Sequence, residues 1–275
     1  MTASSAVTTG TLVVPDARLY YEVRGAGPLL VLIGAPMNAA SFAAAAEQLA
    51  TTNTVLTTDP RGHFGSPLND PDQDSTVLAR AGDLAQLITH VDAGPAVVFG
   101  SSGGAVTALA LAQTSPDLVT TVVAHEPPVR ELLPDAEAQR TLTDDIVATY
   151  AAGDVIGAWR KFFAQAAIPL PEPMLEQLFG GDRDPGQVTS ERFWFAHELR
   201  QTTSWVPDPP LLRSIPTRVI IGIGAESAGQ FCDRTSRELA AAIGVDPVLF
   251  PGDHTGFVND AATFAARLRE VLDQP

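Results

Sequence analysis

The chain has 275 residues, of which 45% are hydrophobic and 18% are charged. This composition is typical of a globular protein with a large buried core, and it excludes an intrinsically disordered chain. The formal net charge of −15 arises from 17 basic and 32 acidic residues. Because such a surface repels nucleic acids and anionic lipids, we expect neither nucleic acid nor membrane as a partner.

The cysteines and histidines argue against a metal or disulfide framework. Cys232 is the only cysteine, and the five histidines show no metal-ligand spacing, so we expect no metal and no other cofactor. The first residues, MTASSAVTTG, lack the basic start and the apolar core of a signal peptide. No apolar run approaches the length of a transmembrane helix. The expectation is a cytoplasmic protein, either a monomer or a homodimer.

In chain order, the sequence predicts a hairpin and then alternating strands and helices. Apolar runs typical of strands lie at 11–14, 18–25, 29–33, 53–59, 95–100, 118–126, 217–224 and 245–250. Helical patterns lie at 41–50, 75–91, 103–114, 230–244 and 262–272. Such alternation predicts an α/β fold with a mostly parallel central sheet and helices on both of its faces.

One block of the chain interrupts this alternation. Between residues 134 and 205 the strand signal disappears, and four helical stretches are separated by proline- and glycine-rich joints such as IPLPEP and VPDPP. The block therefore reads as an inserted helical cap at 134–205, with the core domain formed by 1–133 and 206–275.

Two glycine-rich segments at predicted strand ends carry candidate catalytic groups. Gly100-Ser101-Ser102-Gly103-Gly104 fits the pattern G-x-S-x-G between a buried strand and a helix, which holds the central serine out on a sharp turn. His254 lies in PGDHTGF, directly after the last predicted strand. Because the carboxyl ends of parallel strands meet at one edge of the sheet, Ser102 and His254 are predicted to lie close together as nucleophile and general base.

These motifs, together with GAP at 34–36 and DPRGHFGS at 59–66, resemble those of the α/β-hydrolase family over nearly the whole chain. In that family two backbone N–H groups form an oxyanion hole, and the matching residues here are Ala35 and Gly103. Many relatives have His-Gly-x-Pro at the first of these sites, whereas this chain has Ile33 in place of the histidine. The donor is a main-chain group, so this departure does not remove it.

The resemblance leaves two candidates for the acid of a Ser-His-acid triad. Glu226 follows the seventh strand, which is the commoner position in the family, and Glu126 follows the sixth, a position used by a minority that includes the zearalenone-lactone hydrolases. The text GSSGGAV…AHEPP is similar to that group around its serine and acid, and Pro127 and Pro128 stiffen the segment that holds Glu126. We favour Glu126, with Glu226 as the alternative.

Substrate contacts are predicted in the cap and in the loop after the fourth strand, at His63, Trp194, Phe195 and His197. A cap rich in aromatic residues favours a small, largely apolar substrate.

The sequence thus predicts a serine hydrolase that cleaves a carboxylic ester or lactone through an acyl-enzyme intermediate. The same triad also suits thioester or C–C bond hydrolysis, perhydrolysis or lyase chemistry, because a fold does not determine a reaction. A ligand-binding receptor without turnover is the more remote alternative.

Overall fold

The computed structural model of the protein describes residues 6–274. Within them, eight strands form one sheet in the order β1-β2-β4-β3-β5-β6-β7-β8. The strands are β1 Val7–Val14, β2 Ala17–Arg24, β3 Leu29–Ile33, β4 Thr54–Thr58, β5 Ala96–Ser101, β6 Val119–His125, β7 Arg218–Gly224 and β8 Val248–Phe250. The β1–β2 and β2–β4 pairs are antiparallel, and the other neighbours are parallel. This arrangement confirms the predicted fold class.

Helices cover both faces of this sheet because the central strands are apolar on both sides. The helices of the core are α1 Ala43–Leu49, α2 Val77–Val91, α3 Gly103–Thr114, α9 Pro209–Ser214, α10 Phe231–Ile243, α11 Gly256–Asn259 and α12 Ala261–Asp273. Residues of α2, α3 and α10 share one buried cluster with alternate residues of β3, whereas α1 and α12 share a second cluster with the remaining residues of that strand. Two apolar layers therefore enclose the sheet.

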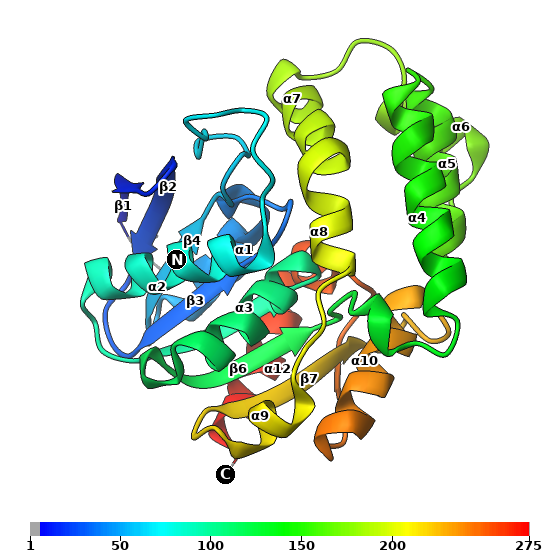
Figure 1. The fold of residues 1–275 in the computed structure, drawn as a ribbon. Coiled ribbons are helices and arrows are strands. Elements are labelled where there is room, and N and C mark those ends of the chain that lie inside the picture. Colours follow the sequence, from blue (N-terminus) through cyan, green and yellow to red (C-terminus); the bar gives the residue numbers. More distant parts are fainter. Residues whose placement is uncertain (1–5, 275) are drawn as a thin grey trace.

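Between β6 and β7 the chain is helical. This part consists of α4 Ala136–Ala151, α5 Val155–Ala166, α6 Glu172–Phe179, α7 Pro185–Phe193, a π-helical turn Trp194–Glu198 and α8 Leu199–Thr203. In Figure 1 these green and yellow helices stand together above the carboxyl ends of the strands. They have a small apolar core of their own, which includes Ile146, Ala158 and Phe195. The division into core and cap at 134–205 stays a prediction.

Two short helices lie where the sequence predicted only joints or loops. Helix α9 begins within the segment VPDPP: the Asp208 carboxylate accepts a hydrogen bond from the Leu211 backbone N–H at 3.0 Å, and Pro209 occupies the first turn, where its missing N–H costs nothing. Helix α11 begins directly after the loop that carries His254. Three short 3-10 turns complete the described elements, at Ala39–Phe42, Pro116–Leu118 and Arg130–Leu132.

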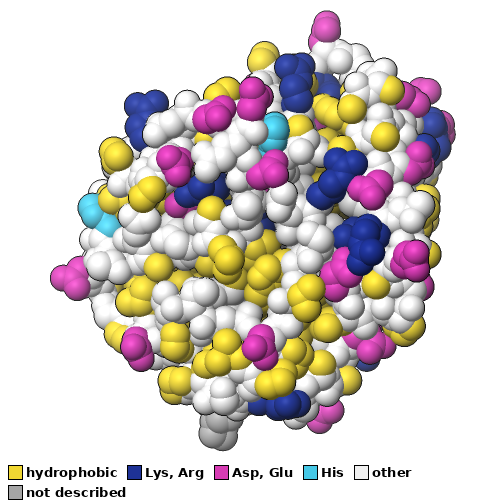
Figure 2. Space-filling view, viewed as in Figure 1, with side chains coloured by type: hydrophobic (Ala, Val, Ile, Leu, Met, Phe, Trp, Pro, Cys, Tyr) yellow, Lys and Arg dark blue, Asp and Glu magenta, His cyan; other side chains and the backbone are white. Residues whose placement is uncertain are grey.

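Acidic side chains are spread over the face shown in Figure 2, and hydrophobic side chains gather near its centre. In the described part of the chain, none of the helices is both long enough and apolar enough to cross a bilayer.

The aromatic packing beneath the sheet gives a first prediction. Phe99 is 1% exposed, and the centroid of its ring lies 5.4–6.4 Å from those of Phe250, Phe257 and Phe264. The rings of Phe250 and Phe264 stack on each other at 5.0 Å. We expect Phe99→Ala to lower the free energy of unfolding by about 3–5 kcal/mol, because it leaves a cavity in a packed core. Urea denaturation measures this change. Leu78→Ala, at an exposed position of α2, is the control, and an equal loss in both variants would contradict the prediction.

Candidate active site

The carboxyl ends of β5, β6 and β7 are level with one another, which brings residues from distant parts of the sequence to one edge. The Ser102 N–H donates to the His125 carbonyl oxygen at 2.9 Å, and the Glu126 N–H donates to the Gly222 carbonyl oxygen at the same distance. These bonds extend the parallel ladder one step beyond each strand. Ser102 and Glu126 are thereby fixed at adjacent strand ends.

Ser102 occupies a strained backbone conformation between β5 and α3. Its φ of 55° and ψ of −124° lie in a region that L-residues rarely adopt and that is often found at functional sites. The turn needs glycine on both sides: a Cβ on Gly100 would lie 2.4 Å from the Gly104 carbonyl oxygen, and a Cβ on Gly104 would lie 2.4 Å from the Ile33 carbonyl oxygen. The glycines let the helix approach the strands closely while Ser102 projects at the turn.

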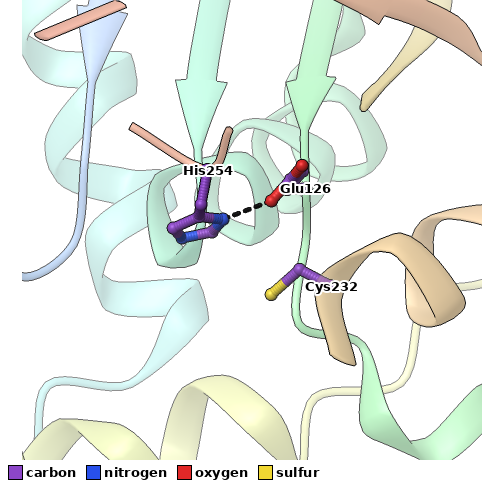
Figure 3. Close-up of side chains that lie close together, drawn as sticks. All are labelled: Glu126, Cys232 and His254. Carbon is purple, nitrogen blue, oxygen red and sulfur yellow. Dashed lines mark hydrogen bonds and ion pairs between the residues drawn. The ribbon is translucent and has the colours of Figure 1, made fainter. Parts of the chain in front are cut away.

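Glu126 also has a left-handed backbone, with a φ of 53°, and its side chain is completely buried. One carboxylate oxygen accepts a hydrogen bond from the Gly224 N–H at 2.8 Å, and the other accepts one from Nδ1 of His254. Figure 3 shows the imidazole of His254 facing this carboxylate. Glu226, the alternative acid, has an exposed side chain on the segment after β7. The carboxylate that contacts His254 is therefore that of Glu126.

The hydrogen bonds determine the charge of Glu126. Burial by itself raises the pKa of this carboxyl, but the hydrogen bond and the charge interaction with His254 outweigh it and lower the pKa to about 2. Glu126 is ionised at neutral pH. Because a carboxylate can only accept, Nδ1 of His254 carries the proton of this hydrogen bond, which makes Nε2 the acceptor atom of the neutral imidazole. This is the tautomer that a general base needs.

The predicted oxyanion-hole residues, Ala35 and Gly103, lie side by side. A Cβ on Gly103 would come within 2.6 Å of the Ala35 carbonyl oxygen, so the two backbones are in close contact. Gly103 is also the first residue of α3, where backbone N–H groups have no partner within the helix. Both residues line the same cavity as Ser102 and His254.

This cavity has a volume of about 450 Å³ and lies between the strand ends and the helices above them. Such a size suits a small organic molecule. One wall is aromatic and aliphatic, and consists of Trp159, Phe162, Phe163, Ile168, Phe179 and Trp194. The opposite wall holds Ser102, His254 and the two backbone donors. A reactive end and an apolar end are thus combined in one site.

Of the predicted substrate contacts, Trp194 lines the cavity, whereas the lining found in residues 6–274 does not include His63, Phe195 or His197. His63 is completely buried and is bonded to Ser190 at 2.7 Å and to Glu198 at 3.0 Å. Phe195 stacks on Tyr150 of α4. Trp194 and Phe195 point in different directions because they are consecutive residues of one helical turn, and Trp194 is the one that lines the cavity.

His197 is the third predicted substrate contact that is not part of the described cavity lining. Its ring is bonded to Asp74 at 3.1 Å on the molecule's exterior. We therefore place neither His63, Phe195 nor His197 in the substrate site.

Sequence reasoning did not assign several polar residues to the cavity, namely Thr143, Gln165, Thr202, Thr203, Gln230, Cys232, Asp253 and Thr255. Asp253 accepts hydrogen bonds from the backbone N–H and the hydroxyl of Thr255, at 2.8 and 2.9 Å, and so shapes the loop of His254. Cys232 lies at the start of α10, beside His254 and Glu126 (Figure 3), and its sulfur is within 4.8 Å of a nitrogen or oxygen atom of each. Burial raises the pKa of the Cys232 thiol well above its ordinary value, so at neutral pH it is a neutral group and not a competing nucleophile. No pattern in the sequence indicates its position.

Comparisons with known proteins agree with this geometry. A model described as "Alpha/beta hydrolase family" matches residues 30–267. The uncharacterized hydrolase YraK of Bacillus subtilis (strain 168) is 28% identical over 275 residues, which cover 98% of this chain and 97% of that protein.

Solved structures with different stated activities share the fold. An E-2-(acetamidomethylene)succinate hydrolase aligns with a TM-score of 0.69 and 20% identity, over 98% of this chain and all of that one. The enol-lactonase from Burkholderia xenovorans LB400 aligns with a TM-score of 0.68 and 18% identity, over 96% of this chain and all of that one. At such identities the likeness extends to the fold alone.

The lowered pKa of Glu126 predicts how the stability of the protein depends on pH. A carboxyl whose pKa is lower in the folded state, here about 2 against an ordinary value of 4.5, stabilises the fold above pH 4.5, and this contribution is lost as the pH falls towards 2. We expect the difference in unfolding free energy between the wild type and Glu126→Gln to be largest near neutral pH and to shrink below pH 4.5. Urea denaturation over this range measures it, with Glu226→Gln as control. A pH-independent difference would contradict the assignment.

Proposed function

Because the chain belongs to the alpha/beta hydrolase family, we propose that it is a serine hydrolase that cleaves carboxylic esters or lactones of small, largely apolar molecules. The observation that carries this proposal is the hydrogen bond between His254 Nδ1 and the buried carboxylate of Glu126, in a cavity that also exposes Ser102 on its strained turn. A neutral, oriented histidine beside a serine on such a turn suits nucleophilic attack on a carbonyl carbon.

In the proposed first half-reaction, the Ser102 hydroxyl attacks the carbonyl carbon while Nε2 of His254 accepts its proton. The carbonyl oxygen becomes an oxyanion, which the backbone N–H groups of Ala35 and Gly103 stabilise. One such donor contributes about 3 kcal/mol in other enzymes. His254, now positively charged, is stabilised by the ionised Glu126 and delivers the proton to the leaving oxygen. The product of this half is an acyl-Ser102 ester.

In the second half, His254 takes a proton from a water molecule, which attacks the acyl carbon. The tetrahedral intermediate collapses, Ser102 regains its proton, and the carboxylic acid leaves. With a lactone, the alcohol and acid groups belong to one product. No cofactor is required for either half.

The cavity lining supports an apolar acyl or alcohol portion in the substrate. Six aromatic or aliphatic side chains form the wall opposite Ser102, and burying apolar surface there contributes roughly 25 cal/mol per Å². A substrate that carries a sugar or a phosphate would lose its hydration against this wall without gaining polar partners. Soluble aryl or alkyl esters and lactones are therefore the substrates to test first.

Covalent labelling tests the nucleophile without knowledge of the natural substrate. An alkyl fluorophosphonate reacts with a serine only where a base activates it, so we expect one adduct per chain on the wild type and none on Ser102→Ala. Intact-mass spectrometry measures the adduct, and circular dichroism checks that both proteins are folded. Labelling of Ser102→Ala, or of Ser101 in its place, would refute the assignment of Ser102.

Comparison of the two glutamates tests the acid. Replacing the acid of a triad by its amide reverses the hydrogen bond to histidine and lowers turnover on the order of 10⁴-fold in a well-studied case, so Glu126→Gln should lose activity on that scale. Glu226→Gln should retain the kcat/KM of the wild type, since its side chain is exposed. Both are measured on the best ester of a panel. Equal losses in the two variants would remove Glu126 from its proposed role.

A further inference from the structure

Cys232, His254 and Glu126 converge on one point at the edge of the cavity. Each offers one atom able to bind a metal ion (a thiol sulfur, an imidazole nitrogen and a carboxylate oxygen), and these atoms lie within 4.8 Å of one another. Figure 3 shows Cys232 of α10 beside the hydrogen-bonded pair of His254 and Glu126. The three side chains come from α10, from the loop after β8 and from the end of β6, so the fold itself holds them together.

The types of donor atom define which ion this group would accept. Sulfur and imidazole nitrogen are preferred by Zn²⁺ and by softer divalent ions, whereas Mg²⁺ and Ca²⁺ prefer sites made only of oxygen. Cysteine, histidine and glutamate all occur as zinc ligands, with bond lengths of about 2.0–2.3 Å. Binding at such distances requires the sulfur to approach the other two ligand atoms and Nδ1 of His254 to move away from the Glu126 oxygen, because the ion has to fit between two atoms that share a hydrogen bond.

The charges also balance. With the thiol deprotonated, the sulfur and the Glu126 carboxylate supply two negative charges against the two positive charges of the ion, and His254 is neutral. The site therefore holds no net charge, which is a condition for placing an ion in a largely apolar cavity. His254 has a side chain 22% exposed, and both it and Cys232 line the cavity, so an ion has a path to them.

We propose that Cys232, His254 and Glu126 form an inhibitory site for Zn²⁺ or a similar soft divalent cation. Binding would replace the hydrogen bond between His254 and Glu126. The thiol proton is released to water, and the imidazole proton moves from Nδ1 to Nε2 as the metal takes Nδ1. An imidazole protonated on Nε2 can no longer accept the proton of Ser102. The part of this proposal that concerns inhibition rests on the proposed function, whereas the part that concerns binding does not.

Cadmium is a direct probe, because a cadmium–thiolate bond gives an ultraviolet charge-transfer band and Cys232 is the only cysteine of the chain. We expect titration of the purified, metal-free protein with Cd²⁺ to produce this band with a stoichiometry of one. Zn²⁺ should displace it, Mg²⁺ should not, and EDTA should abolish it. The band should be absent from Cys232→Ser.

Variants of the other two ligands distinguish a three-residue site from a lone thiol. Loss of a group that merely orients a metal ligand costs on the order of 10–100-fold in affinity, so His254→Gln and Glu126→Gln should each weaken Cd²⁺ binding by at least about tenfold. The matched control is His90→Gln, which removes an exposed histidine of α2 far from the site. An unchanged affinity in both ligand variants, or no band in the wild type, would overturn the proposal.

A second experiment measures whether the bound ion inhibits the reaction of Ser102. Zn²⁺ should slow fluorophosphonate labelling of Ser102 in the wild type by at least tenfold, EDTA should restore the rate, and Cys232→Ser should show a much smaller ratio between its rates without and with Zn²⁺. Binding of cadmium by a protein that fluorophosphonate never labels would refute the serine-hydrolase proposal and leave the metal site standing. Normal labelling that saturating Zn²⁺ does not slow would refute the inhibition.

Discussion

The buried negative charge of Glu126 is the constraint on which the arrangement of the site depends. A carboxylate without contact with water is stable only where hydrogen bonds replace its hydration, and here the Gly224 N–H and His254 Nδ1 provide them. Removal of either donor would leave one oxygen of this buried carboxylate without its hydrogen bond. The hydrogen bond to Glu126 therefore also holds the loop of His254 in place.

The backbone at this edge of the sheet adopts unusual dihedral angles that place the side chains of the site. Ser102 and Glu126 both have a positive φ, a conformation that costs of order 1–3 kcal/mol at a residue other than glycine. Both strained residues are fixed by backbone hydrogen bonds to the neighbouring strand. His125 lies beneath the site, and burial lowers its pKa to about 4, so this histidine is neutral. It therefore adds no positive charge that would compete with His254 for the carboxylate of Glu126.

The fold and the positions of Ser102 and His254 were predictable because they depend on local sequence. Continuous apolar runs predict buried parallel strands, and the glycines around Ser102 are needed wherever helix and strand come that close. The choice between Glu126 and Glu226 was not decided by the residues themselves, since each follows a strand end at the same edge. Only the direction of the side chains separates them, and that direction depends on the backbone twist at residue 126, which no residue type in the sequence demands.

Long-range polar contacts were beyond sequence reasoning, and His63 illustrates the reason. Its partners, Ser190 and Glu198, lie 127 and 135 residues further along the chain. The π-helical turn that places Glu198 there has no pattern of its own in the sequence, although such turns often occur at functional sites. From the sequence, His63 is interpreted as a substrate contact because it lies in a loop beside the site, whereas in the structure it contacts α7 and the π-helical turn.

Polar contacts also hold the two helical sides of the cavity, one formed by α8 and the π-helical turn and the other by α5 and α6. Arg80 donates to Thr107 of α3 at 3.1 Å and to Thr202 of α8 at 2.8 Å, and it lies 3.5 Å from Glu198. Since separating such buried charges is costly, the side of the cavity formed by α8 and the π-helical turn is fixed to the core. The side formed by α5 and α6 combines stacked rings, such as Trp159 on Phe179 with centroids 4.2 Å apart, with polar contacts, such as the hydrogen bond from Trp159 Nε1 to Glu191 at 2.8 Å. Because hydrogen bonds to charged groups resist displacement more than ring contacts do, Glu191 fixes the orientation of the Trp159 ring beside the cavity.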